Sequence, residues 1–494
     1  MILNRYERAT PLRWLTRAAA LLALSIPAVA FSAEGGGGSL GADLPLWSVL
    51  PFVGILLSIA IMPLVAPHIW HSHFGKIAGA WAILLAVPFL VAYKGAAMLE
   101  INHIILIDYI PFIIVLWGLF TISGGIVLKG RLVGTPIVNT ALLLVGTVLA
   151  SWVGTTGAAM LLIRPIIRAN AWRTHKQHVI IFFIFLVANI GGALTPLGDP
   201  PLFLGFIHGV PFFWTLGLFF PMITVVALLL VVFYLLDGYL LKKDTESPPH
   251  MGGPNEPLSI AGAHNFIFIA GILLLVLFSG SVEMSEITIL GVHVAWQDII
   301  RNFGIVLMGW LSLKTTSREL RHANGFNWDP ILEVAYLFAG IFITIIPALA
   351  MLKAGSNGAM AFIVNNVNEP WQYFWVTGIL SSFLDNAPTY LTFFNTALGK
   401  LHLSEAEISA FLASGQVAAG KQASLDSFET LLKAISMGAV FMGANTYIGN
   451  APNFMVRAIA EENHIPMPSF FGFMLWSVVI LMPVFFVITF IFLR

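Results

Sequence analysis

The segment 191–203 reads GGALTPLGDPPLF and interrupts sequence that is otherwise apolar enough to lie in a membrane. Glycine and proline lower the stability of a helix, and an aspartate is costly in hydrocarbon. Backbone that is not helical is tolerated at membrane depth only where it is buried in protein or lines a wet cavity. The segment therefore predicts a broken helix whose free carbonyl and amide groups face a functional site.

The composition indicates the class of protein. Of the 494 residues, 58% are hydrophobic and 10% are charged, against about 25% charged residues in a typical soluble domain. This predicts an integral membrane protein, and the net charge of zero argues against a nucleic-acid partner. The absence of cysteine excludes disulfides, thiolate metal sites and cysteine nucleophiles. The sequence contains no HExxH, GxSxG or glycine–lysine phosphate loop, so we expect neither an enzyme nor a bound cofactor.

The first 45 residues have the features of a targeting signal. Four arginines precede the apolar run LLALSIPAVA, which ends in the small-residue triplet of a signal-peptidase site, Ala28-Val29-Ala30. We expect a signal peptide over 1–30 and a glycine-rich linker over 31–45; the alternative is a first anchor helix that is not cleaved. We expect this multi-pass protein in a bacterial-type inner (plasma) membrane.

Several apolar runs approach the roughly 20 residues that a helix needs to cross a bilayer. If 46–66 runs inward, the loops richest in lysine and arginine fall on one side, which the positive-inside rule places in the cytoplasm. This holds only if 132–163 and 372–399 each enter and leave on the same side, so we predict two re-entrant hairpins. The candidate spans are 46–66, 77–93, 108–128, 212–236, 264–281, 302–313, 331–352 and 469–493.

The broken segment has a copy in the second half of the chain. GGALTPLGDPPLFL (191–204) and MGANTYIGNAPNFMV (442–456) share the pattern G-x-x-T-x-x-G-x-x-P-x-F at a constant spacing of 251 residues. The hairpin tips WVGTTGAAM (152–160) and FLDNAPTYL (383–391) precede them in the same order. The charge pattern makes the two halves run in opposite directions, and inverted repeats with interrupted helices are the architecture of secondary transporters. We expect the two breaks to meet midway across the bilayer and to hold a small ion.

Asp385 and Asn386 form the sharpest candidate site. They lie within GILSSFLDNAPTYLTFF, where apolar residues flank them and a proline interrupts the helix. A charged aspartate at this depth should face a cavity or a partner. Sodium, a hard cation, prefers oxygen ligands, so this pair together with Ser381, Ser382 and Thr389 predicts a Na⁺ site. Asp385 would bind Na⁺ and a proton in alternation; the alternative is a structural aspartate that caps the hairpin.

Further candidates lie at the first tip and in the two breaks. Asp199 either lines the site or caps the short helix that follows it, and the matching position in the second break is Asn450. Each remaining hydroxyl or amide either binds a ligand or serves as a packing contact between helices. The remaining candidates are Thr155, Thr156, Asn189, Thr195, Gly198, Pro201, Asn445, Thr446, Gly449 and Pro452.

The order of hairpin tip and chain break in each half resembles that of the ion transporter superfamily. That group includes D-type bacterial sodium/proton antiporters, arsenite permeases, citrate–metal transporters and divalent-anion/sodium symporters. The segments TPLGDPPLFLGFIHGVPFFW and DNAPTYLTFFN resemble most a branch described as sodium/proton antiporter or putative citrate transporter. The resemblance implies a scaffold domain and a transport domain, in a homodimer that works by an elevator-like movement.

We therefore predict an all-α polytopic membrane protein of inverted repeats, with two re-entrant helical hairpins and two broken transmembrane helices in a scaffold plus a transport domain. The chain divides accordingly into seven regions. They are 1–30, signal peptide; 31–45, glycine-rich linker; 46–104, N-terminal scaffold helices; 105–236, repeat 1, with its tip at 152–157 and its broken helix at 178–209; 237–263, cytoplasmic linker; 264–328, connecting helices; and 329–494, repeat 2, with its tip at 384–389 and its broken helix at 428–460.

The residues at the two hairpin tips are compatible with more than one function. Divalent-anion symporters resemble one another in carrying Ser-Asn-Thr at both tips, whereas here the tips read VGTT at 153–156 and LDN at 384–386. A negative aspartate would repel a di- or tricarboxylate unless a cation lay between them. We therefore expect a secondary active Na⁺/H⁺ antiporter whose partners are small inorganic cations and the lipid bilayer. The alternatives are Na⁺- or H⁺-coupled transport of an organic anion such as citrate, and an arsenite-type permease.

Overall fold

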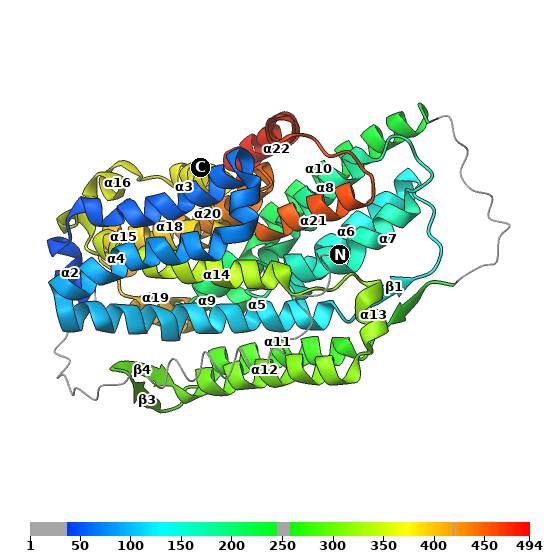
Figure 1. Ribbon diagram of the computed structural model, residues 1–494. Coiled ribbons are helices and arrows are strands. Elements are labelled where there is room, and N and C mark those ends of the chain that lie inside the picture. The colour runs from blue at the N-terminus through cyan, green and yellow to red at the C-terminus, as the bar shows by residue number, and fades with distance from the viewer. Residues whose placement is uncertain (1–36, 245–256, 418–419) are drawn as a thin grey trace. The chain divides into compact units, whose positions relative to one another are not determined.

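The computed structural model describes residues 37–244, 257–417 and 420–494 (Figure 1). The predicted signal peptide lies outside these residues, as do parts of the two predicted linkers. The described residues fold mainly into helices, with two small antiparallel sheets that the sequence did not predict. The chain is thus a helical, multi-pass membrane protein.

The first helices begin inside the predicted glycine-rich linker. Residues Gly37–Asp43 form a short helix there, because Leu40 and Leu44 are buried and the helix packs against a later one, α15. A left-handed Lys94 (φ 46°) interrupts the long helix that follows. The elements are α2 (Gly37–Asp43), the 3₁₀ turn η1 (Leu46–Val49), α3 (Leu50–Val65), α4 (Pro67–His103), the π-helix η2 (Ile104–Tyr109) and α5 (Ile110–Ser123).

The next segment contains a helix pair followed by a broken helix. The first helix of the pair begins at Pro136 after an N-cap by Thr135, and the chain reverses at Gly154, whose φ of 80° favours glycine. Asn139 donates to Asn170 Oδ1 at 2.9 Å, so the two open ends of the pair meet. The elements are β1 (Val127–Lys129), α6 (Pro136–Val153), α7 (Thr155–Ala169), α8 (Gln177–Leu186), η3 (Ile190–Leu194), α9 (Pro200–Ile207), η4 (Phe212–Leu218) and α10 (Phe219–Leu241).

One small sheet joins the predicted repeat 1 to the predicted linker, and the other lies in the connecting region. Strand β1 pairs with β2, with Val127 opposite Ala261. Arg168, at the end of α7, donates to the carbonyl of Leu128 at 3.0 Å, so two of the basic loops lie at the same end of the molecule, as the charge pattern predicted. Figure 1 shows α11 and α12 side by side, joined by the β3–β4 hairpin. The elements are β2 (Ser259–Ala261), α11 (Asn265–Ser281), β3 (Glu286–Ile289), β4 (Val292–Ala295), α12 (Trp296–Thr315) and α13 (Arg318–Ala323).

The last segment again contains a helix pair followed by a broken helix. The pair begins with a capping box made by Glu369 and Gln372. Lys400, near its other end, donates to the carbonyl of Val367 at 2.7 Å, so these open ends also meet. The elements are α14 (Asp329–Thr344), α15 (Ile346–Lys353), η5 (Gly355–Asn357), α16 (Ala361–Asn366), α17 (Pro370–Phe383), α18 (Asn386–Leu401), α19 (Glu405–Ser414), α20 (Gln422–Met442), η6 (Gly443–Asn445), α21 (Ala451–Glu462) and α22 (Phe470–Phe492).

Six helices of the described residues are long and apolar enough to cross a membrane, or seven if the bent pair α14–α15 is one span. The spans predicted at 77–93 and 108–128 fall in one helical stretch, Pro67–Ser123. The span predicted at 302–313 lies in α12, which is not among the six; Asp298 and Arg301 in its first turns lower its hydropathy.

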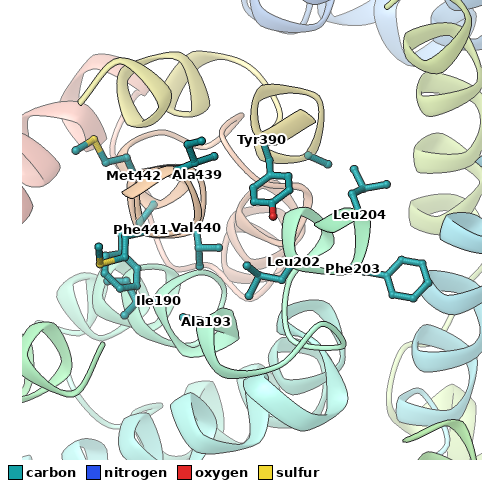
Figure 2. Packing of buried hydrophobic residues seen from close by; sticks show 14 of the residues in the cluster. Ile190, Ala193, Leu202, Phe203, Leu204, Tyr390, Ala439, Val440, Phe441 and Met442 are labelled. Atoms are coloured by element: carbon teal, nitrogen blue, oxygen red, sulfur yellow. The ribbon is translucent and has the colours of Figure 1, made fainter. Parts of the chain in front are cut away.

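Most helices of the described residues pack in two sets. The first consists of α3, α4, α5, α11, α12 and α14; the second consists of the two helix pairs, the two broken helices, α10 and α22. The sets meet where α5 contacts α7 and α9. Helix α15 follows α14 in the chain but packs on α18 of the second set. Figure 2 shows the core of the second set, in which Leu202 of α9 and Val440 of α20 are buried side chains and Tyr390 of α18 packs on Gly205.

Candidate functional site

In each chain break, two glycines allow backbone atoms to come into direct contact. In the second break, a Cβ on Gly449 would lie 2.5 Å from the carbonyl oxygen of Gly443. In the first break, a Cβ on Gly198 would come even closer to the carbonyl oxygen of Gly192. Only glycine fits at Gly198 and Gly449 because backbone atoms pack against backbone atoms there. This contact explains why both copies of the pattern contain two glycines at the same spacing.

A threonine ties each break to the helix pair before it. Thr195 Oγ1 donates to the carbonyl of Ser151 in α6, and Thr446 Oγ1 donates to the carbonyl of Ser382 in α17 at 2.5 Å. In each half, the backbone N–H two residues after the threonine donates to its hydroxyl oxygen at 3.2 Å. Two helix–break junctions with the same hydrogen bonds at matching sequence positions indicate that the halves share one local fold.

The two breaks contact each other through equivalent positions. Asn450 Nδ2 donates to Asp199 Oδ1 at 2.9 Å, and these residues occupy the same place in the two copies of the pattern. Asn189 Nδ2 donates to Asn453 Oδ1 at 2.7 Å next to this contact. Contact between equivalent positions is what a twofold relation between the halves produces. The breaks are therefore in contact, as expected.

Asp199 is the centre of this junction. Its side chain, 1% exposed, accepts hydrogen bonds from Thr155 Oγ1 at 3.1 Å and Asn386 Nδ2 at 2.5 Å, besides Asn450. Four elements therefore converge on one carboxylate: both tips and both breaks. Asp199 precedes α9 but makes no capping hydrogen bond to it, so of the two predicted roles the side chain takes the site rather than the cap. Four helix N-termini, of α7, α9, α18 and α21, lie beside these residues and favour a negative charge there.

Asp385 makes different contacts. Its carboxylate accepts a hydrogen bond from the backbone N–H of Ala387 at 3.1 Å and so caps α18. The side chain is half-buried and lines the same cavity as Asp199. Asn386, predicted as its partner in a Na⁺ site, directs its amide to Asp199 instead. The predicted Asp-Asn pair thus contributes to one junction through two different contacts.

A cavity of about 470 Å³ adjoins the junction. Apolar side chains of α5 and α14 form one wall, and the tips and breaks form the other. The lining carries five carboxyl groups and one guanidinium. These are Asp199, Asp329, Glu333, Asp385, Glu462 and Arg164. A cavity with this excess of carboxyl groups attracts cations.

Several buried amide oxygens near the junction have no hydrogen-bond partner among the described residues. They include Oδ1 of Asn386 and Oδ1 of Asn450, whose amide nitrogens both donate to Asp199. Oδ1 of Asn189 and Oδ1 of Asn445 are also unpaired. Buried polar atoms are normally paired, so unpaired oxygens next to a carboxylate fit the ligand preference of a hard cation.

The structure divides the predicted site residues in two. Seven line the cavity: Thr155, Thr156, Gly198, Asp199, Asp385, Asn450 and Pro452. The others lie behind them, where they tie the tips to the breaks or pack the helix starts: Asn189, Thr195, Pro201, Ser382, Asn386, Thr389, Asn445, Thr446 and Gly449.

The sequence alone did not identify the other charged residues of the cavity. Arg164, the α14 residues Asp329 and Glu333, and Glu462 come from three separate parts of the sequence and belong to no shared motif. Only their place beside the cavity indicates a role.

Membrane-crossing helices around two contacting chain breaks and a cavity that carries charged groups define a membrane protein of the transporter class. Residues 41–493 match the family described as "Putative citrate transport", and the chain belongs to this family. The match spans both helix pairs and both breaks. A search of curated proteins found no significant match.

Proposed function

We propose that the protein is a secondary active Na⁺/H⁺ antiporter that binds both cations at the junction of the two breaks. The observation that carries the proposal is Asp199, a buried carboxylate that accepts hydrogen bonds from three other elements at the wall of an acidic cavity. An ionisable group at membrane depth is costly and marks an ion or proton pathway.

In this proposal the two helix pairs are re-entrant hairpins and the halves are inverted repeats. The open ends of each pair meet, which agrees with chain segments that enter and leave on one side of the membrane. The first packing set is the scaffold and the second is the transport domain, which moves across it like an elevator. We further propose a homodimer in a bacterial plasma membrane, with the basic loops in the cytoplasm.

The charges of the cavity favour a cation over an anion as the bound ion. Five carboxyl groups face one guanidinium, so a free tricarboxylate would meet net repulsion. Na⁺ would find oxygen ligands in Asp199 and, after rotation of their amides, in Asn386 and Asn450. In the arrangement seen here, these amides instead donate to the carboxylate.

Two carboxylates explain how Na⁺ and protons would compete. Asp199 and Asp385 line the same cavity. Like charges in one buried site repel each other unless a cation or a proton lies between them. Binding of Na⁺ would therefore release a proton, and binding of a proton would release Na⁺. That competition is the requirement for exchange.

A second candidate is Na⁺- or H⁺-coupled transport of an organic anion such as citrate. The family description favours it. So does Arg164, which lines the cavity and has one buried nitrogen without a hydrogen-bond partner among the described residues. The volume of the cavity is also larger than a single Na⁺ needs. In this reading, the cation at Asp199 would screen the carboxylates from the anion.

Transport assays in inside-out vesicles test the proposal. Addition of Na⁺ to acidified vesicles should release protons in the wild type, and Asp385→Asn and Asp199→Asn should each reduce the rate more than about 100-fold. Glu407→Gln, a carboxyl change on α19 far from the cavity lining, is the matched control and should exchange normally. Full exchange by Asp385→Asn, in a protein that remains folded, would remove that residue from the mechanism.

Uptake of labelled citrate, with and without Na⁺, separates the two candidates. The antiporter predicts Na⁺-driven proton release with no citrate present and no Na⁺-dependent citrate uptake. Citrate accumulation that requires Na⁺, with no proton release in its absence, would favour the second candidate.

A further inference from the structure

Four charged side chains form a cluster away from the cavity. His208 Nδ1 lies 3.0 Å from Glu405 Oε2, and Lys353 Nζ lies 2.6 Å from Glu405 Oε1. His208 Nε2 lies 2.7 Å from Asp108 Oδ1, at ion-pair distance but without the alignment of a hydrogen bond. We name Asp108, His208, Lys353 and Glu405 the outer cluster.

The outer cluster connects the two packing sets. Asp108 lies in the π-helix η2, which contacts α4, α5 and α14 of the first set. His208 directly follows α9, and Glu405 begins α19 after α18, so both are continuous with the second set. The Asp108–His208 pair therefore crosses the boundary between the sets. Lys353 ends α15, which follows α14 in the chain but packs on α18, so its pair with Glu405 ties the end of this connection to the second set.

The cluster is partly sealed from solvent. The side chains of His208 and Asp108 are 8% and 4% exposed, whereas those of Glu405 and Lys353 are 30% and 48% exposed. Burial alone would raise the pKa of Glu405, but the positive charges of His208 and Lys353 hold it below its usual range. Glu405 is therefore charged, and separating the cluster would leave the buried His208 without the carboxyl groups that face it.

The outer cluster lies away from the cavity: Figure 1 shows α15 and α19 toward one end of the molecule and α7 toward the other. Arg164 of α7, a basic residue on the side predicted to be cytoplasmic, lines the cavity. None of the four cluster residues lines the cavity. The cavity thus reaches α7, whereas the ion pairs of the outer cluster lie toward α15 and α19.

We propose that the outer cluster is a latch that holds the inward-open arrangement and must separate each time the site turns outward. The inference rests on the proposed alternating movement of the two sets, and not on which ion is carried. A purely structural role would stabilise the fold without changing the balance between inward- and outward-open forms.

A reporter cysteine measures that balance directly, because the chain has no cysteine of its own. Ala458 of α21 lines the cavity, so Ala458→Cys should react from the cytoplasmic face with a membrane-impermeant maleimide. Adding His208→Gln should lower the labelling rate at least about threefold, because the population shifts away from the inward-open form. Lys353→Met, at an exposed position where folding is not at risk, should lower it less.

The matched control is Glu407→Gln. Glu407 pairs with Lys421 at 2.7 Å, and both follow α18 within the second set, so the labelling rate should not change. Unchanged labelling in both latch variants, with the wild-type elution profile in detergent, would overturn the latch. This readout needs no transported ion, so a failure of Na⁺/H⁺ exchange leaves the test of the latch intact.

A cross-link supplies the converse test. In an Asp108→Cys/His208→Cys variant, a short bifunctional thiol reagent should stop Na⁺-driven proton release by more than about tenfold, and a reductant should restore it. Full exchange by the cross-linked protein would contradict the requirement that the cluster separates.

Discussion

In the first half of the molecule the carboxylate lies in the break, at Asp199, whereas in the second half it lies at the tip, at Asp385. The equivalent positions are Asn450 and Gly154. The glycine pairs and the threonine bonds are the same in both halves. The backbone frame is thus repeated, while the side chains that would carry the chemistry are not.

The position of the site accounts for this difference. Because Asp199 and Asn450 contact each other at 2.9 Å, a carboxylate at both positions would place two negative charges in direct contact. An asparagine on one side replaces that repulsion with a hydrogen bond. In the proposed ion site, a repeated frame therefore favours an asymmetric choice of residues.

Exchanging Asp199 and Asn450 is the strictest test of whether the two halves are equivalent at the site. Asp199→Asn alone should lower Na⁺-driven proton release more than about 100-fold, because three hydrogen-bond donors lose their charged acceptor. The double variant Asp199→Asn/Asn450→Asp returns a carboxylate to the equivalent position and should recover at least about a tenth of the wild-type rate. A double variant as inactive as the single one would show that the halves are not equivalent at the site.

Alanine substitutions in the glycine pairs test whether both breaks require glycine to the same degree. Gly198→Ala and Gly449→Ala each push a methyl group into a backbone carbonyl, so each should destabilise the protein by about 3 kcal/mol or more. Gly198→Ala should be the worse, since its contact is the closer. The control is Gly79→Ala in α4, where a Cβ would meet no atom within 4 Å. Thermal unfolding in detergent, followed by tryptophan fluorescence, measures all three; a mild effect in either break would show that its loop can relax.

Much of this frame was predictable from sequence. Gly192 and Thr195 recur at a constant spacing with Gly443 and Thr446, and backbone geometry demands those residue types, so the pattern indicated where the breaks lie. The contact between the breaks, seen in the Asp199–Asn450 hydrogen bond, was expected from the predicted inversion of the halves.

The roles of the two aspartates were not predictable in the same way. Asp199 and Asp385 each directly precede a helix. An aspartate that caps a helix and an aspartate that binds an ion can have the same neighbours in the sequence. Only contacts across the junction distinguish them, because Asn386 lies 187 positions from Asp199 along the chain. The charged residues of the cavity, such as Arg164 and Glu333, escaped prediction for the same reason.

Removing the threonine hydrogen bonds compares the two halves through a smaller loss of stability. Thr195→Val and Thr446→Val keep the shape of the side chain but leave the carbonyl of Ser151 or Ser382 with one donor fewer. Each should cost about 1–2 kcal/mol of unfolding free energy and slow exchange without abolishing it. The two variants should agree with each other in chemical unfolding experiments. A large difference would mean that one break depends on its helix pair more than the other does.

The smallest effect is expected in α19, a segment of the second half that has no counterpart in the first. The ammonium of Lys421 and the hydroxyl and backbone of Ser404 lower the pKa of Glu407 to about 2 from its ordinary 4.5. A carboxyl group with a lowered pKa stabilises the folded protein above its ordinary pKa, and this contribution disappears as the pH falls from about 4.5 to about 2. The group lies near the surface, so screening limits the contribution to about 0.5 kcal/mol or less. Glu407→Gln should therefore lower the unfolding temperature in detergent only slightly at pH 7 and not at all at pH 2, and a loss that grows toward low pH would contradict the assignment.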